Sequence, residues 1–199
     1  VAMTELETGG LRESALRQAG SDGFPFPSIV ASGSNAALPH ARPTSRSIAR
    51  GDFLLLDFGA RVAGYCSDIT RTFVVGPANA EQREVHDVVR QANERAVRAV
   101  RPGMSGRDAD GVARGYIEDR GFGELFGHSL GHGIGLEVHE APRLAKTAEK
   151  ALVEGAVVTV EPGIYRPGWG GVRIEDDVHL GAGGAQVLTR FARELIEIG

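Results

Sequence analysis

The sequence predicts a mixed α/β (α+β) domain of two similar halves, in which antiparallel strands are flanked by helices. Amphipathic helical patterns alternate along the chain with short apolar runs, and turn residues lie at the ends of these runs. One run is repeated, because residues 51–59 and 155–163 both read glycine, five mostly apolar residues, a carboxylate, one further residue and glycine. The 199 residues, 42% hydrophobic and 24% charged, suffice for a buried core. Two copies of one unit would bring corresponding residues to a common centre.

The start of the chain predicts one helix followed by short strands and loops. Thr4 and Glu7 stand three residues apart before an apolar series, which is the form of a capping box, and Gly20 follows as a C-terminal stop. Residues 21–50 contain four of the nine prolines together with many small polar residues. This composition favours short strands and loops over a helix.

The remaining elements follow from hydrophobic periodicity. Residues 53–58 and 62–75 predict the two strands of a hairpin, joined near residues 59–64. Residues 79–100 give the clearest helix, because apolar residues recur at about 3.6-residue spacing opposite a charged face. Residues 105–121 predict a further helix between a capping serine and a terminal glycine. After it, strands alternate with glycine turns, and the 28 glycines are about twice the average frequency.

Composition excludes several classes of function. A net charge of −4 provides no basic field for nucleic acid or an anionic membrane, so neither is expected as a partner. The longest apolar runs, such as residues 53–56, fall far short of the roughly 18 residues that a membrane span needs, and we expect no signal peptide. The single Cys66 cannot form an internal disulfide. We therefore expect a cytoplasmic protein.

Acidic residues inside apolar strands are the strongest signal for chemistry. A carboxylate buried alone costs several kcal/mol unless a cation or a proton compensates its charge. Any one of them could instead cap a strand end or pair with Arg61, Arg71 or Arg173. Four carboxylates and a histidine in duplicated strand contexts predict two divalent metal ions, whose charge offsets desolvation and mutual repulsion. The candidate metal ligands are Asp57, Asp68, His132, Glu161 and Glu175.

The glycine-rich segment 126–140 contains three histidines. His128 and His132 have the spacing of the zinc-binding HExxH helix, but serine replaces its glutamate and three glycines argue against a helix. These glycines also lack the spacing of a dinucleotide-binding loop. We expect them to let the backbone approach the site, so that His132 binds metal while His128 and His139 line the substrate side. Two other histidines are assigned no role: His86 and His179.

Four segments carry a family resemblance: Gly64–Phe73, Gly131–Gly135, Val160–Tyr165 and Val172–Asp176. Together they resemble the signature segments of the M24 metallopeptidases, most closely aminopeptidase P and prolidase, and the similarity extends over residues 4–199. The resemblance implies the pita-bread fold, in which two pseudo-two-fold-related halves with a curved antiparallel sheet surround a dinuclear metal centre. It further implies one catalytic domain over residues 1–199, with halves of about 1–101 and 102–199. The N-terminal domain usual in this branch is expected to be absent, as in a fragment of a longer protein.

The resemblance also implies a role for each site residue. Asp57 would bind one metal, Asp68 and Glu175 would bridge both, and His132 and Glu161 would hold the other. The implied catalytic residues are His139, Glu161 and His128, and the implied substrate-binding residues are His40, His128 and His139. Arg173, which lies just before the candidate ligand Glu175 in the sequence, would contact the metal ligands and hold them in place without binding metal itself.

The implied activity is hydrolysis of the bond between an N-terminal residue and proline, by an Xaa-Pro aminopeptidase or dipeptidase. Its substrate would be a peptide with proline in second position. Of the two divalent ions, Mn²⁺ is expected first and Co²⁺ or Zn²⁺ can substitute, because oxygen ligands with one imidazole suit hard or borderline ions. The question whether the protein forms a homodimer is left open at this point. The alternatives are a methionine aminopeptidase, which usually lacks the 172–176 stretch, a catalytically inactive binding module of the same fold, and a non-peptidase hydrolase or lyase.

Overall fold

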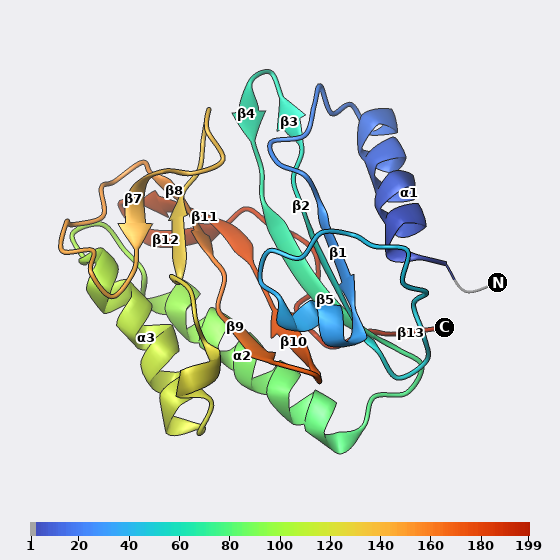
Figure 1. Cartoon of the computed structure of the whole chain (residues 1–199). Helices are drawn as coiled ribbons and strands as arrows, with labels where there is room; N and C mark the ends of the chain where they lie inside the picture. The colour runs from blue at the N-terminus through green and yellow to red at the C-terminus, as the bar shows by residue number, and fades with distance from the viewer. Residues whose placement is uncertain (1–2) are drawn as a thin grey trace.

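The computed structural model describes residues 3–199, which form two main sheets, two small ribbons and three α-helices (Figure 1). The helices are α1 (Glu5–Gln18), α2 (Ala80–Ala99) and α3 (Gly106–Asp119), with 3₁₀ turns η1 (Gly33–Ala37) and η2 (Gly123–Leu125). The strands of the first half are β1 (Ile29–Ser32), β2 (Phe53–Phe58), β3 (Arg61–Val62), β4 (Tyr65–Cys66) and β5 (Ile69–Val75). The later strands are β6 (Gly131–Gly133), β7 (Glu140–Leu144), β8 (Val157–Val160), β9 (Gly163–Arg166), β10 (Gly170–Arg173), β11 (Asp176–Gly181), β12 (Gly184–Val187) and β13 (Glu197–Ile198).

The two sheets repeat one topology. The first has the strand order β1-β2-β5-β13 and the second the order β12-β11-β8-β6-β7. The series α1, β1, β2, ribbon β3–β4, β5 therefore corresponds to the series α3, β6, β8, ribbon β9–β10, β11. The predicted duplication is thus confirmed at the level of strand order, and β2 and β8, which carry the repeated run, occupy matching positions. Strand β13 is an addition, because it returns to pair in parallel with β5.

The three predicted helices are confirmed, and so are the two caps predicted at Thr4 and Ser105. Thr4 forms the expected capping box with Glu7 at the start of α1. Asn79 caps α2, and the side chain of Ser105 accepts a hydrogen bond from the Asp108 amide at the start of α3. The buried residues of α2 follow the predicted apolar stripe, and this helix packs on α3 and lies behind β8, β9 and β10. Among residues 3–199, the helices fall short of the length and apolar character that a bilayer crossing requires.

The predicted strand over residues 62–75 is wrong in its first part. Strand β5 starts at Ile69, and the preceding residues form the separate ribbon β3–β4. The turn of this ribbon has positive φ at Ala63 (50°) and Gly64 (85°), which reverses the chain within two residues. Strand alternation continues on both sides of such a turn, so periodicity alone did not reveal it. As a result, Asp68 lies at the entrance of β5 rather than within a long strand.

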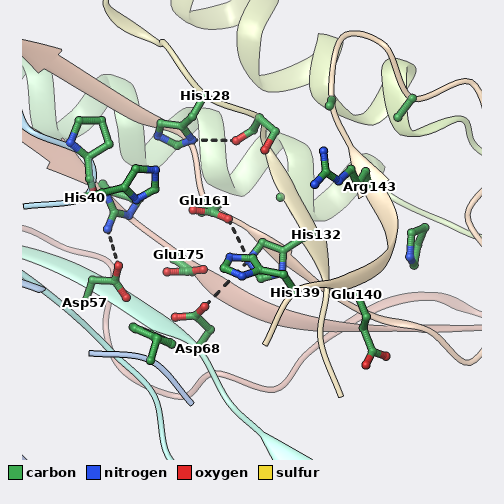
Figure 2. Close-up of a pocket in the computed structure, with 18 of the residues that line it drawn as sticks. His40, Asp57, Asp68, His128, His132, His139, Glu140, Arg143, Glu161 and Glu175 are labelled. Carbon is green, nitrogen blue, oxygen red and sulfur yellow. Dashed lines mark hydrogen bonds and ion pairs between the residues drawn. The ribbon is translucent and has the colours of Figure 1, made fainter. Parts of the chain in front are cut away.

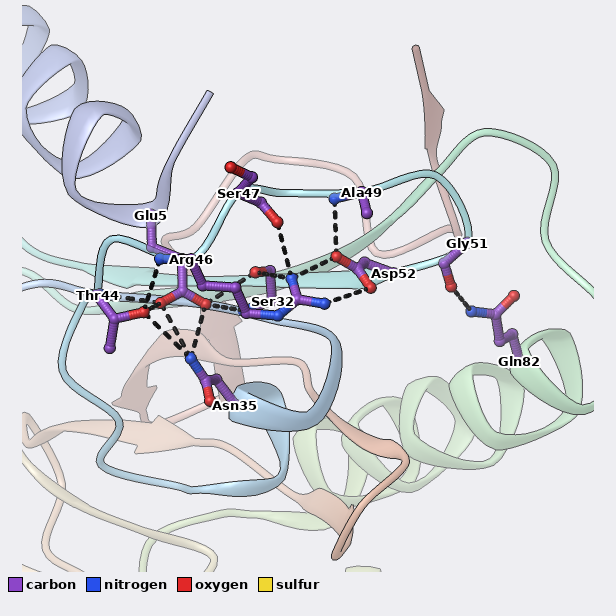
Figure 3. Close-up of polar contacts among 10 residues, drawn as sticks. All are labelled: Glu5, Ser32, Asn35, Thr44, Arg46, Ser47, Ala49, Gly51, Asp52 and Gln82. Carbon is purple, nitrogen blue, oxygen red and sulfur yellow. Dashed lines mark hydrogen bonds and ion pairs between the residues drawn. The ribbon is translucent and has the colours of Figure 1, made fainter. Parts of the chain in front are cut away.

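A buried carboxylate ties α1 to the first sheet (Figure 3). Glu5 accepts hydrogen bonds from the amide and hydroxyl of Ser32 (2.7 and 2.8 Å) and from the amide and hydroxyl of Thr44 (2.9 and 2.6 Å). The side-chain amide of Asn35 lies 3.2 Å from both of its oxygens. Burial alone would raise the pKa of Glu5, but these hydrogen bonds lower it. These hydrogen bonds of Glu5 fix both ends of the loop between Ser32 and Thr44, which carries His40.

Candidate metal centre

The structure brings the five candidate metal ligands together between the two halves (Figure 2). Each comes from a strand or a strand end: Asp57 in β2, Asp68 before β5, His132 in β6, Glu161 after β8 and Glu175 between β10 and β11. We call these five residues the carboxylate–histidine cluster. Its members come from both copies of the repeated unit, as the sequence predicted.

Short distances join the members of the carboxylate–histidine cluster. His132 Nε2 lies 3.4 Å from Glu161 Oε1 and 4.0 Å from Asp68 Oδ2. Asp68, His132 and Glu175 each offer one atom within 4.8 Å of the others. Asp57 points into the same space and is 8% exposed. Ligand atoms this close to one another could hold a metal ion in common.

Two glycines hold His132 in place. Strand β6 runs between β7 and β8, and a Cβ atom at Gly131 would collide with the Thr159 carbonyl oxygen. A Cβ atom at Gly133 would collide with the Ala141 carbonyl oxygen. The glycines therefore let His132 enter between two neighbouring backbones, which refines the expectation that they serve close approach to the site.

The ring of His132 presents a lone pair to the carboxylates. Its Nδ1 lies 2.9 Å from the carbonyl oxygen of Gly133 and donates a hydrogen bond to it. Nε2, which faces Asp68 and Glu161, is then unprotonated and can bind a metal ion. Burial lowers the pKa of His132 to about 4, so the ring is neutral at pH 7.

The carboxylates repel one another in a buried space. Burial first, and then the charges of Asp57 and Glu161, raise the pKa of Asp68 well above its ordinary value. Burial and the charges of Asp68 and Glu161 do the same for Glu175. Burial raises the pKa of Glu161 to about 7. A fifth carboxylate, Asp177, accepts a hydrogen bond from the Asp68 amide at 3.0 Å, and burial raises its pKa to about 7. The site thus holds more carboxylate groups than a single neighbouring guanidinium can neutralise.

Arginine pairing, the alternative explanation, accounts for one of the four carboxylates. Arg173 Nη2 lies 2.6 Å from Asp57 Oδ2. Arg71 instead pairs with Asp176, and Arg61 is exposed on β3. The buried oxygens Asp57 Oδ1 and Asp68 Oδ1 have no hydrogen-bond partner among residues 3–199. Oxygen ligands with one neutral imidazole and two orphaned oxygens fit divalent cations.

Two threonines, which the sequence reasoning missed, hold ligand carboxylates. Thr70 Oγ1 donates to Glu175 Oε2 at 2.6 Å, and Thr159 Oγ1 donates to Glu161 Oε1 at 3.1 Å. Thr70 lies two residues after Asp68, and Thr159 two residues before Glu161. Because side chains alternate along a strand, residues two apart share a face. That periodicity was the available signal for both.

A cleft of about 1590 Å³ opens onto the carboxylate–histidine cluster. His40, from the first half, and His139, from the second, line this cleft, and both side chains are exposed. The ring centroid of His139 lies 4.3 Å from that of His132. The walls also include Pro27 and Pro39. The cleft therefore offers histidine donors and apolar surface beside the cluster.

His128 lines the same cleft, but its ring is already occupied. Nδ1 donates to the Ser129 carbonyl oxygen and Nε2 accepts from the Tyr165 hydroxyl, both at 2.8 Å. Burial lowers the pKa of His128 to about 4, which keeps the ring neutral at pH 7. Tyr165, in β9, is another residue that the sequence reasoning missed. In this arrangement His128 contributes a wall of the cleft rather than a free proton donor.

The fold and the site define a class of protein: domains in which two α/β copies hold a carboxylate-rich site for divalent metal ions between them. The model of metallopeptidase family M24 matches residues 1–182. The chain belongs to this family, and its fold is the pita-bread fold that the resemblance implied.

Named relatives narrow the comparison within the family. The chain is 47% identical over 192 residues to an Xaa-Pro dipeptidase of Pyrococcus furiosus, which covers 96% of this chain and 55% of that protein. The solved Xaa-Pro dipeptidase of Bacillus anthracis superposes with a TM-score of 0.97 at 48% identity, covering 99% of this chain and 56% of that one. The X-Pro aminopeptidase of Thermotoga maritima gives 0.97 at 46% identity, with 99% and 55% coverage. The chain thus spans about half the length of the relatives it matches.

Proposed function

We propose that this chain is the catalytic part of an Xaa-Pro peptidase, which hydrolyses the bond between an N-terminal residue and proline. The convergence of the carboxylate–histidine cluster at the floor of a cleft is the observation that carries the proposal. Relatives named Xaa-Pro dipeptidase and X-Pro aminopeptidase support it. The repeat supports a division of the chain near residues 101 and 102.

The cluster would hold two divalent ions, with Mn²⁺ favoured and Co²⁺ or Zn²⁺ as substitutes. Asp57 would bind one ion, and His132 with Glu161 the other. Asp68 and Glu175 would bridge, which agrees with their burial and with the charge they exert on each other. Arg173 would hold Asp57 from behind.

The side chains around the cluster supply the remaining chemistry. Bound ions would supply a water of lowered pKa, toward about 7, and positive charge for the scissile carbonyl oxygen. Glu161 would take a proton from the attacking water and pass it to the proline nitrogen. His139, exposed in the cleft, would donate a hydrogen bond to the oxyanion. His40 and His128 would contact the substrate as walls of the cleft.

A cation in the cleft favours short substrates. Arg143 of β7 pairs with His132 of β6 in the sheet register and lines the cleft (Figure 2). A guanidinium there would bind the free carboxylate of a dipeptide, whose proline carries the C-terminus. We therefore place dipeptides before longer peptides as substrates.

The test is a cleavage assay on chelator-treated protein reloaded with Mn²⁺. Ala-Pro should be cleaved and Ala-Ala left intact, while calorimetry should show uptake of two ions. Uptake without cleavage of Ala-Pro or longer Xaa-Pro peptides would favour a non-peptidase hydrolase or lyase. A chain that takes up no ions would be a binding module. Cleavage of Met-Ala but not Ala-Pro would indicate a methionine aminopeptidase.

We also propose a cellular location and an assembly state for the protein. Cys66 is free, which agrees with a reducing cytoplasm. A homodimer is the assembly proposed for the protein. Sedimentation of the protein at several concentrations tests it.

A further inference from the structure

Asn93 lies at the centre of α2, fully buried, behind the strands that carry two of the proposed ligands. Its side-chain amide nitrogen donates to the carbonyl oxygen of Val160 at 2.9 Å and to that of Ile174 at 3.3 Å. These are the residues immediately before Glu161 and Glu175. One NH₂ group therefore spans two ligand-bearing segments, and its two hydrogens match the two carbonyl acceptors.

Each of these peptide units is also held from its other side. The amide of Glu161 donates to the Leu130 carbonyl oxygen at 2.8 Å. The amide of Glu175 donates to the Thr70 carbonyl oxygen at 3.1 Å. With the carbonyls bound to Asn93 and the amides bound to neighbouring backbone, both peptide planes are fixed. The Cα atoms from which the two carboxylates project are fixed with them.

The two segments meet at one edge of the five-stranded sheet, where Asp176, the first residue of β11, pairs with Val160 of β8. Val160 ends β8 of the five-stranded sheet, and Ile174 follows the ribbon β9–β10. Asn93 links them through a helix of 20 residues that packs behind both. The link has a cost, because Asn93 Oδ1 is buried and has no hydrogen-bond partner within residues 3–199. A buried acceptor without a partner destabilises the folded state. An apolar residue here would avoid that cost, so the amide is not explained by packing alone.

We propose that Asn93 is a positioning residue that sets the separation of Glu161 and Glu175 and so the geometry of the metal pair. The inference rests on the proposed metal centre. Asn93 touches no proposed ligand side chain and acts through the backbone of two strands. Loss of such support for ligands typically weakens metal affinity by about 10- to 100-fold.

The experiment compares Asn93→Leu, which keeps the volume but removes both donors, with Gln82→Met as a matched control. Gln82 is also a buried amide of α2, and it donates at 2.9 Å to the carbonyl oxygen of Gly51, which, unlike Val160 and Ile174, is not adjacent in the chain to a proposed ligand (Figure 3). Mn²⁺ titration by calorimetry, the electron paramagnetic resonance signal of a coupled Mn²⁺ pair, and thermal unfolding of the metal-free protein are measured for parent and variants.

Both variants should unfold at lower temperature than the parent. Asn93→Leu should also bind Mn²⁺ about 10- to 100-fold more weakly and lose the coupled-pair signal, with kcat falling while KM changes little. Gln82→Met should keep parental Mn²⁺ affinity and signal. Asn93→Ser, which retains one donor, should be intermediate, and it decides the question alone should Asn93→Leu not fold. Parental affinity and signal in the Asn93 variants would overturn the proposal. A parent that takes up no Mn²⁺ would overturn the metal centre instead.

Discussion

Arg173 of the second half pairs with Asp57 of the first, with 2.6 Å between Nη2 and Oδ2. The same guanidinium donates from Nη1 to the Tyr165 hydroxyl at 2.8 Å and from Nε to Thr70 Oγ1 at 3.0 Å. The Thr70 hydroxyl in turn donates a hydrogen bond to the Glu175 carboxylate. One arginine thus orients carboxylates from both copies of the repeat.

Arg173→Met should destabilise the metal-free protein more than the metal-loaded one. Removing one partner of a buried ion pair costs about 3–5 kcal/mol, because the other charge stays buried and unpaired. Metal ions beside Asp57 would neutralise that charge and reduce the loss. Urea unfolding with chelator and with Mn²⁺ measures the difference.

Arg193→Met is the control for this prediction. Arg193 lies 2.6 Å from Asp176, which keeps Arg71 as a second partner. Its loss should be smaller and independent of Mn²⁺. An equal loss for Arg173→Met with and without metal would contradict a metal ion beside Asp57.

Asp68→Ala should weaken Mn²⁺ binding far more than His128→Ala. Asp68 belongs to the cluster, and its buried Oδ1 has no hydrogen-bond partner among residues 3–199, whereas both ring nitrogens of His128 are hydrogen-bonded elsewhere. Asp68→Ala should also abolish activity, while His128→Ala should retain metal. Calorimetric Mn²⁺ titration decides, and equal affinity in Asp68→Ala and parent would count against the ligand assignment.

Arg143→Met should raise KM for Ala-Pro by about 10- to 100-fold, the equivalent of losing a hydrogen bond to a charged group. A peptide extended beyond proline, whose carboxylate lies farther out, should be affected less. Steady-state kinetics with both substrates tests this. A similar KM change for dipeptide and tripeptide would remove Arg143 from carboxylate recognition.

His86 should make stability fall in acid. Burial lowers its pKa to about 4, with Arg90 and Arg71 adding to the shift and Asp87 and Glu194 opposing it. As the pH falls, His86 becomes protonated near pH 6.5 in the unfolded chain but only near pH 4 in the folded protein. Stability is therefore full above pH 6.5 and is lost as the pH falls toward 4, by about 3 kcal/mol for this group.

The measurement is a difference between two proteins, since other groups titrate in the same range. The unfolding free energy of His86→Gln, taken relative to the parent, should rise as the pH is lowered from 7.5 to 4. A difference that stays constant with pH would show that His86 has the same pKa in the folded and the unfolded protein.

Sequence periodicity predicted the parts of the fold that local chemistry determines. The caps at Thr4 and Ser105 and the pairing of β2 with β5 follow from residues close together in the chain. The ribbon β3–β4 was missed because its turn rests on left-handed backbone at Ala63, a residue type without turn preference. The return of β13 to β5 joins residues more than a hundred positions apart, and no local pattern encodes such a pairing.

The members of the carboxylate–histidine cluster were predicted from sequence because charge inside an apolar run is visible there. Arg173 was predicted as a support, but Thr70, Thr159 and Asn93 were not, because they are ordinary residues whose role depends on what the fold places opposite them. Asp177 was missed as well, since it follows Asp176 and looks like part of a polar strand end. Its burial becomes evident only in three dimensions.

The last strand has a consequence for the integrity of the molecule. Strand β13 lies on the first sheet, and Arg71 of that sheet donates to the carbonyls of Phe191 and Ala192 at 2.7 and 2.8 Å. The C-terminal end of the chain therefore packs against the sheet of the first half. A protease that nicks the connection between α2 and α3 would leave two pieces clasped together, and separately produced fragments should reassemble into the intact domain.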